Sequence, residues 1–180
     1  MKGAILEKGE SFYTDMKRIF DAIDNVQNEY NWLITDLETN SNHPNLDGYT
    51  SGYLWLSGNE LTEIAEETEY FQWIWAVLSG FPKDVTKEQA LQYDLPYADG
   101  YTEFWKNPVT LQHPLATIEI VPWDSSLVLV ISKDDKIVKG FLESMPHAED
   151  LELHNNTPPS AARRGSSLYQ REPWGLSPKF

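Results

Sequence analysis

Residues 70–79 have the sequence YFQWIWAVLS and include one of the two most apolar stretches of the chain. Aromatic and aliphatic residues fill both alternating sets of positions, and Gly80 and Pro82 follow directly. A strand that is apolar on both sides is buried on both faces of its sheet. The stretch therefore predicts a central strand, with a buried helix as the competing interpretation of the same apolar run.

Further strands are expected on either side, where short alternating or apolar runs are bounded by turn formers. These strands are residues 1–7, 30–35, 49–56, 117–121, 127–131 and, as a last short strand, 151–154. The sequence PWDSS separates residues 117–121 from residues 127–131, which predicts an antiparallel hairpin.

Helices are expected between these strands. Apolar residues from Phe12 to Val26 recur at helical spacing and predict an amphipathic helix over residues 10–26. Ser57 and Glu60 have the spacing of a capping box, which predicts that a helix begins there. Shorter helices are expected at residues 86–93 and 134–145, with one helical turn at 102–105 inside a long connection, residues 97–115.

The predicted fold class is α+β. We expect one domain, residues 1–154, with an antiparallel or mixed sheet of about five to six strands and helices packed on one face. Residues 155–180 are rich in proline, serine, glycine and asparagine and predict an extended C-terminal arm.

The C-terminal arm and the rest of the chain carry net charges of opposite sign. The chain carries −14 in total, and residues 155–180 carry +3, so residues 1–154 carry −17. The basic, partly apolar arm is therefore a candidate for docking on its own body or on a second copy, which would give a homo-oligomer. An artificial extension of the chain is the alternative. The candidate docking residues are Arg163, Arg164, Tyr169, Arg171 and Trp174.

Composition excludes several classes of protein. The chain has no cysteine, so it is neither a disulfide scaffold nor a thiol enzyme. Its acidity argues against direct nucleic-acid binding, which needs lysine and arginine. There is no signal-peptide pattern and no apolar run long enough to span a membrane, so no membrane association and a cytoplasmic location are expected.

Catalytic and metal-binding motifs are missing from the sequence. The four histidines show no helical pairing and are expected in surface loops, so we expect no metal ligand and no cofactor. Glu60, Glu63 and Glu67 would share one helix face, where they indicate a partner-facing acidic patch, a cation site or a solvated surface.

Aromatic residues provide the second group of candidate partner-binding residues. Tyr97, Tyr101, Trp105 and Trp123 fall in predicted connections and turns, beside acidic residues such as Asp99. Exposed aromatics among acids suit a basic protein partner. A loop that folds over the core is an equally weighted alternative.

Four short motifs stand out in the chain: Tyr30-Asn31-Trp32, Gly58-x-x-Leu61, Tyr70-Phe71 leading to Phe81-Pro82, and Trp123-Asp124-Ser125. In these motifs the chain resembles a family of small acidic bacterial proteins, a domain of unknown function found chiefly in Gram-positive bacteria. The resemblance spans residues 10–154, and it implies no activity, cofactor or catalytic residue. In size, acidity and aromatic content the chain is also similar to immunity proteins of bacterial polymorphic toxin systems.

These observations favour a non-enzymatic binding protein that inhibits or neutralises a basic protein partner, such as a toxin or a nucleic-acid-handling protein. One alternative is a structural protein that assembles through its C-terminal arm. A second alternative is a small hydrolase with an unrecognised pair of carboxylates.

Overall fold

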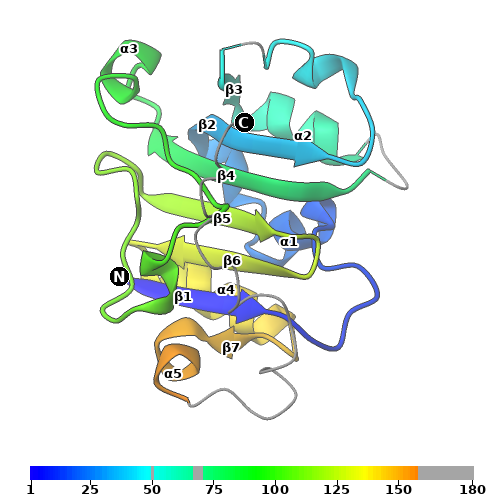
Figure 1. Cartoon of the computed structure of the whole chain (residues 1–180), viewed down its shortest axis with the longest axis vertical. Helices are drawn as coiled ribbons and strands as arrows, with labels where there is room; N and C mark the ends of the chain where they lie inside the picture. Colours follow the sequence, from blue (N-terminus) through cyan, green and yellow to red (C-terminus); the bar gives the residue numbers. More distant parts are fainter. Residues whose placement is uncertain (50, 67–70, 158–180) are drawn as a thin grey trace, which may run out of the picture.

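A computed structural model describes residues 1–49, 51–66 and 71–157. Seven strands form one sheet in the order β3-β2-β4-β5-β6-β1-β7, and every neighbouring pair is antiparallel. Figure 1 shows the sheet from β3 at the top to β7 at the bottom. The α+β class is confirmed, with slightly more strands than expected.

The strands β1, β5 and β6 agree closely with the sequence pattern, whereas β2 extends to Thr39 and β3 begins at Tyr53 rather than at residue 49. The bounds of the strands are β1 Lys2–Leu6, β2 Tyr30–Thr39, β3 Tyr53–Ser57, β4 Trp73–Pro82, β5 Ile118–Trp123, β6 Leu127–Ser132 and β7 Glu149–Asp150. The predicted hairpin is confirmed as β5–β6, in which Trp123 pairs with Leu127. The N-terminal strand β1 lies between β6 and β7.

The described residues also contain five α-helices and three short 3-10 helices; the last helix follows the last strand, and the others lie between strands. The helices are α1 Met16–Ala22, α2 Gly58–Glu66, α3 Lys87–Ala90, α4 Asp135–Ser144 and α5 Leu151–Asn156. The 3-10 helices are η1 Val26–Glu29, η2 Pro44–Leu46 and η3 Glu103–Trp105.

Two local predictions are wrong, each because a polar residue ends or starts a helix. The helix expected over residues 10–26 is shorter, since Asp15 caps its start and Asp24 and Asn25 adopt left-handed backbone after its end. The strand expected at residues 151–154 is helix α5, since the Asp150 side chain accepts a hydrogen bond from the backbone N–H of Leu153.

The prediction of a central strand is confirmed by β4, which lies between β2 and β5. Trp73, Ala76 and Leu78 enter the core on one face, whereas Val77 and Phe81 enter the cores on the other. Gly80 is required at a close approach, because an added Cβ would lie 2.6 Å from Cγ2 of Ile118 and 3.0 Å from the Trp32 ring.

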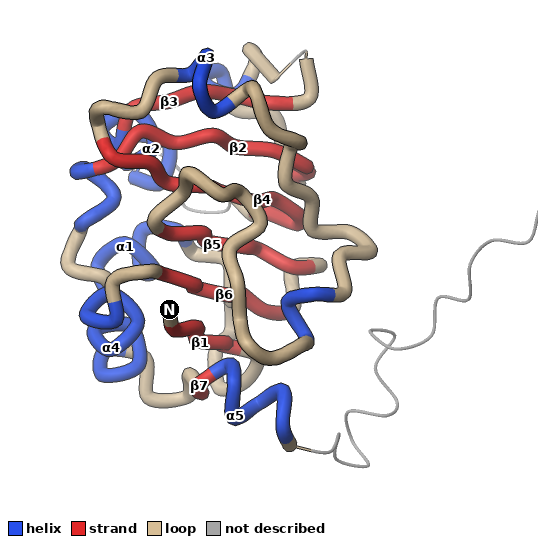
Figure 2. Tube along the Cα trace, turned by 90° about the vertical axis from the view of Figure 1, so that its left-hand side faces the viewer, coloured by secondary structure: helices blue, strands red, loops and turns tan. Residues whose placement is uncertain are grey.

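One face of the sheet is covered by α1, α2 and α4, which form the helical layer (Figure 2). Its core joins alternate strand residues to the buried faces of these helices. Typical contributors from the helices are Phe20, Leu61 and Phe141, each at most 1% exposed. The spacing of apolar residues explains this layer directly.

The opposite face is covered mainly by residues 83–117, which we call the connection. It joins β4 to β5, contains α3 and η3, and crosses the sheet as a largely irregular loop (Figure 2). Two smaller cores lie beneath it: one contains Phe104 and Val109, and the other contains Ala90 and Ala116. A long irregular segment packed on a sheet is uncommon, and such segments often carry function.

None of the helices within the described residues is both long and apolar enough to cross a membrane. The C-terminal docking residues Arg163, Arg164, Tyr169, Arg171 and Trp174, and also Glu67, lie outside the described residues.

Candidate functional site

The two groups of predicted partner-binding residues lie on opposite sides of the sheet. Glu60 and Glu63 are exposed on α2, in the helical layer. Tyr97, Tyr101 and Trp105 belong to the connection. The structure therefore brings together the aromatic candidates, and it separates them from the acidic helix face.

The aromatic candidates form one continuous row of ring contacts. Ring centroids are 5.3 Å apart for Tyr97 and Tyr101, and 4.7 Å apart for Tyr101 and Phe104. Phe104 lies 6.1 Å from Trp123, and Trp105 lies 5.2 Å from Trp123. All four contacts are edge-to-face, which is a favourable arrangement for aromatic rings.

The outer end of this row, at Tyr97, is its most exposed part, whereas Tyr101 and Trp105 are partly buried. Among the described residues, five large apolar side chains are exposed, and three of them lie in one short stretch: Tyr93, Leu95 and Tyr97, at 43%, 37% and 50%. We call these three residues the exposed patch. Trp123, predicted as a partner-binding residue, is only 6% exposed and instead supports Trp105 and Phe104 from below.

Asp36 fixes the connection directly behind the exposed patch. Its Oδ2 accepts hydrogen bonds from the backbone N–H of Ala98 at 2.7 Å and of Asp99 at 3.0 Å. Asp36 has a φ of 50° and lies where the register of β2 against β4 shifts. Such irregularities in a strand change the direction in which a side chain points. Aspartate also adopts the left-handed backbone region more readily than most residues.

Glu119 fixes the returning half of the connection. Its carboxylate accepts hydrogen bonds from the backbone N–H groups of Gln112 and His113, both at 2.9 Å, and from the Ser79 hydroxyl at 3.3 Å. The side chain is completely buried on β5. Burial raises the pKa of Glu119 to about 7, although these three hydrogen bonds oppose the shift.

Gln112 links the two halves of the connection. Its side-chain amide donates to the backbone carbonyl of Tyr97 at 2.7 Å and accepts from the backbone N–H of Tyr97 at 3.1 Å. Because the backbone N–H of Gln112 is held by Glu119, the exposed patch is connected to the buried carboxylate through a single residue. The Gln112 side chain therefore holds both the N–H and the carbonyl of Tyr97.

The expectation that the histidines lie in surface loops is wrong for His154, which lies in α5 with a side chain that is 7% exposed, and for His43 and His113, which are buried. In His43 and His113, Nδ1 accepts a hydrogen bond from the backbone N–H two residues further on, at 3.1 Å and 3.2 Å respectively. Nε2 of His113 lies 3.0 Å from the carbonyl of Ala90, which assigns the ring proton to Nε2. Burial lowers the pKa of His113, so the ring is neutral and serves the packing of the connection.

Glu60 has a structural partner on α2. Its carboxylate accepts hydrogen bonds from the backbone N–H and the hydroxyl of Ser57, both at 2.7 Å, and the Ser57 hydroxyl accepts from the backbone N–H of Glu60. The predicted capping box is therefore confirmed. These bonds from Ser57 lower the pKa of Glu60, which keeps the carboxylate ionised in its capping role.

A pocket of about 270 Å³ opens between α1 and the start of β4. Its apolar lining includes Phe12, Met16, Phe71 and Trp73. Two of the charged residues at its margin already serve α1, since Asp15 caps the helix and Lys17 pairs with Asp21, and Glu66 of α2 also lines it.

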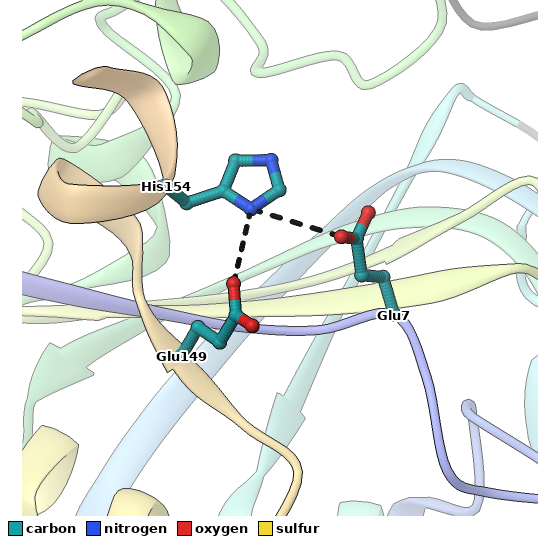
Figure 3. A group of neighbouring side chains, drawn as sticks. All are labelled: Glu7, Glu149 and His154. Atoms are coloured by element: carbon teal, nitrogen blue, oxygen red, sulfur yellow. Dashed lines mark ion pairs between the residues drawn. The ribbon is translucent and has the colours of Figure 1, made fainter. Parts of the chain in front are cut away.

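Glu7, Glu149 and His154 form a cluster that could hold a metal ion (Figure 3). Glu7 follows β1, Glu149 lies in β7 and His154 lies in α5. The ring of His154 also lies 6.4 Å from the ring of Trp105, so the cluster adjoins the inner end of the aromatic row. The sequence gives no signal for this cluster, because the fold brings distant segments together.

Comparisons with family models, curated proteins and solved structures found no significant match.

Proposed function

We propose that this protein is a non-enzymatic, acidic binding protein that inhibits or neutralises a basic protein partner. We propose further that the partner docks on the exposed patch of the connection. The observation that carries this proposal is that three large apolar side chains are exposed together on a segment whose backbone is anchored by buried or partly buried polar groups.

Anchoring matters because binding costs conformational entropy. A flexible loop must be ordered when a partner binds, and this cost reduces affinity. In the connection, Asp36 and Gln112 hold the backbone of residues 97–99 before any partner arrives. Tyrosine side chains on such a segment offer contact area at a small further entropic cost.

The chemistry of the partner follows from charge. Asp94, Asp99 and Glu103 are exposed on the connection around the aromatic residues, against Lys106 as the neighbouring base. The net charge of −14 adds a long-range field that attracts a basic surface and speeds encounter. A toxin or a nucleic-acid-handling protein with a basic cleft has this complementary chemistry, which favours an immunity-like role.

The experiment is a capture of partners from host lysate on the full-length protein, at low and moderate salt, followed by affinity measurement with the recovered protein. We expect one basic partner whose binding weakens with salt. Tyr97→Ala should weaken binding at least about tenfold, because central aromatic anchors dominate interface energies.

A matched pair of charge reversals separates the connection from the acidic helix face. Asp94→Lys and Glu63→Lys change the charge equally, at exposed positions on opposite sides of the sheet. We expect Asp94→Lys to slow association much more than Glu63→Lys. If only Glu63→Lys abolishes binding, the partner docks on α2 and the proposed surface is wrong.

Recovery of the protein by itself would contradict the proposal and favour self-assembly. In that case, deletion of residues 155–180 and measurement of the mass in solution would test docking through the C-terminal arm.

A further inference from the structure

We propose that Glu7, Glu149 and His154 form a binding site for a divalent transition cation of the zinc class. This inference is independent of the proposed partner surface, since it depends on different residues. Its basis is the convergence of one imidazole nitrogen and two carboxylate oxygens from three separate segments of the chain (Figure 3).

The distances are suitable for a shared cation. Nδ1 of His154 lies 3.8 Å from Oε1 of Glu7 and 3.7 Å from Oε2 of Glu149. The three ligand atoms all lie within 4.8 Å of one another. Zinc bonds of about 2.1 Å at tetrahedral angles separate two ligand atoms by about 3.4 Å, so small side-chain movements complete the site.

The histidine is well placed to be the central ligand. Its side chain is 7% exposed, and Nδ1 faces both carboxylates. The backbone that carries it is held at both ends of α5, since Asp150 caps the start and Thr157 hydroxyl donates to the carbonyl of Leu153. Asn155 further ties α5 to the connection through the carbonyl of Phe104.

Lys8 orients one of the carboxylates. Its Nζ binds Oε1 of Glu149, while Oε2 of the same carboxylate points toward His154. Groups that hold a ligand from behind are a regular feature of metal sites. The two carboxylates carry −2 and Lys8 carries +1, so a divalent cation leaves the group with a small net positive charge.

The donor set selects the class of cation. One imidazole with two carboxylates suits zinc, cobalt, nickel or manganese, whereas calcium and magnesium prefer all-oxygen sites. Three protein ligands leave one tetrahedral position for water. The site would join the N-terminal strand to the last two described elements of the chain.

The test is a titration of the full-length, chelator-treated protein with zinc chloride by calorimetry, with cobalt absorption as a second readout. We expect one zinc ion per chain with micromolar or tighter affinity, and a higher melting temperature for the zinc-loaded protein. Trp105 lies near His154, so cobalt should also quench tryptophan fluorescence.

Variants identify the ligands. Glu7→Gln, Glu149→Gln and His154→Ala should each weaken zinc binding at least about tenfold. His147→Ala and Glu143→Gln are matched controls at exposed positions, and they should bind zinc as the wild type does. Circular dichroism checks folding, and Glu7→Gln is the conservative variant if His154→Ala is unstable.

Two results would overturn the inference. One is no zinc binding by the wild-type protein in the micromolar range. The other is equal binding by the wild type and by folded Glu7→Gln and Glu149→Gln, which would assign the ion to another part of the surface.

Discussion

The helical layer and the connection cover opposite faces of one sheet, and they are held in place in different ways. In the helical layer, apolar residues recur at helical spacing within each helix. Their side chains, such as Phe20 and Phe141, fill one continuous core. In the connection, the inward side chains fill two smaller cores, and polar groups on the sheet hold the irregular backbone.

Buried polar groups are needed where the covering segment is irregular. A helix satisfies its own backbone hydrogen bonds, so apolar contacts are enough to pack it on a sheet. An irregular segment on a sheet leaves backbone N–H groups without such partners, and each one costs free energy if it is buried unpaired. Glu119 and Asp36 pair with these groups, which allows a loop to replace a second helical layer.

The largest effect should come from deleting a core side chain on each face. Phe141→Ala, in the helical layer, should lower the free energy of unfolding by about 3–5 kcal/mol, since the residue is fully buried. Phe104→Ala, in η3 of the connection, should lower the free energy of unfolding by less, and it should increase hydrogen exchange in residues 91–117 first. Chemical denaturation combined with hydrogen exchange measures both. If both substitutions lower the free energy of unfolding equally, and hydrogen exchange rises throughout the described residues, the two layers unfold as one unit.

The next effect is the pH dependence that Glu119 confers. Its pKa rises from an ordinary value of 4.5 to about 7 on folding, so the folded chain binds more protons between these values. The contribution of Glu119 to the free energy of unfolding is therefore complete below about pH 4.5 and falls by about 3 kcal/mol as the pH rises to about 7.

Glu119→Gln should remove this slope while leaving a side chain of the same shape. Urea unfolding of both proteins at about pH 5 and about pH 8 gives the comparison. If the stability difference between the two proteins is the same at both values, the carboxylate does not carry the proposed proton linkage.

The smallest effects should come from the two capping boxes, one on each side of the sheet. Ser57 caps α2 and Thr86 caps α3, each with a reciprocal side chain three residues later. Ser57→Ala should cost about 1 kcal/mol of global stability, a typical value for an N-cap. Thr86→Ala should lower the global stability by less, and it should mainly destabilise α3 itself. A larger global loss for Thr86→Ala would show that α3 supports the whole connection.

The sequence predicted those parts of the fold that depend on neighbouring residues. The capping box of α2, the β5–β6 hairpin and helix α4 all follow from short-range patterns, and all three are present. The path of the connection could not be predicted in this way. Asp36 and Ala98 are 62 positions apart, and no local pattern indicates that a β-bulge brings them together.

The candidate sites show the same difference between features set by neighbouring residues and features set by distant ones. Tyr97, Tyr101 and Trp105 are close in sequence, so their association on one segment was predictable, whereas the burial of Trp123 beneath them was not. The cation cluster was missed because its carboxylates come from opposite ends of the described chain. Lys8 and Glu149, which belong to the same group, are 141 positions apart.

The position of β1 has a consequence for how the chain is made. Residues 2–6 are synthesised well before their partners, residues 127–132 and 149–150. At about 5–20 residues per second, the N-terminal strand waits for on the order of ten seconds before it can pair. During that time β2, β3 and β4 can already assemble, while the apolar Ile5 and Leu6 stay available to chaperones. Insertion of β1 into the sheet is therefore among the last steps of folding.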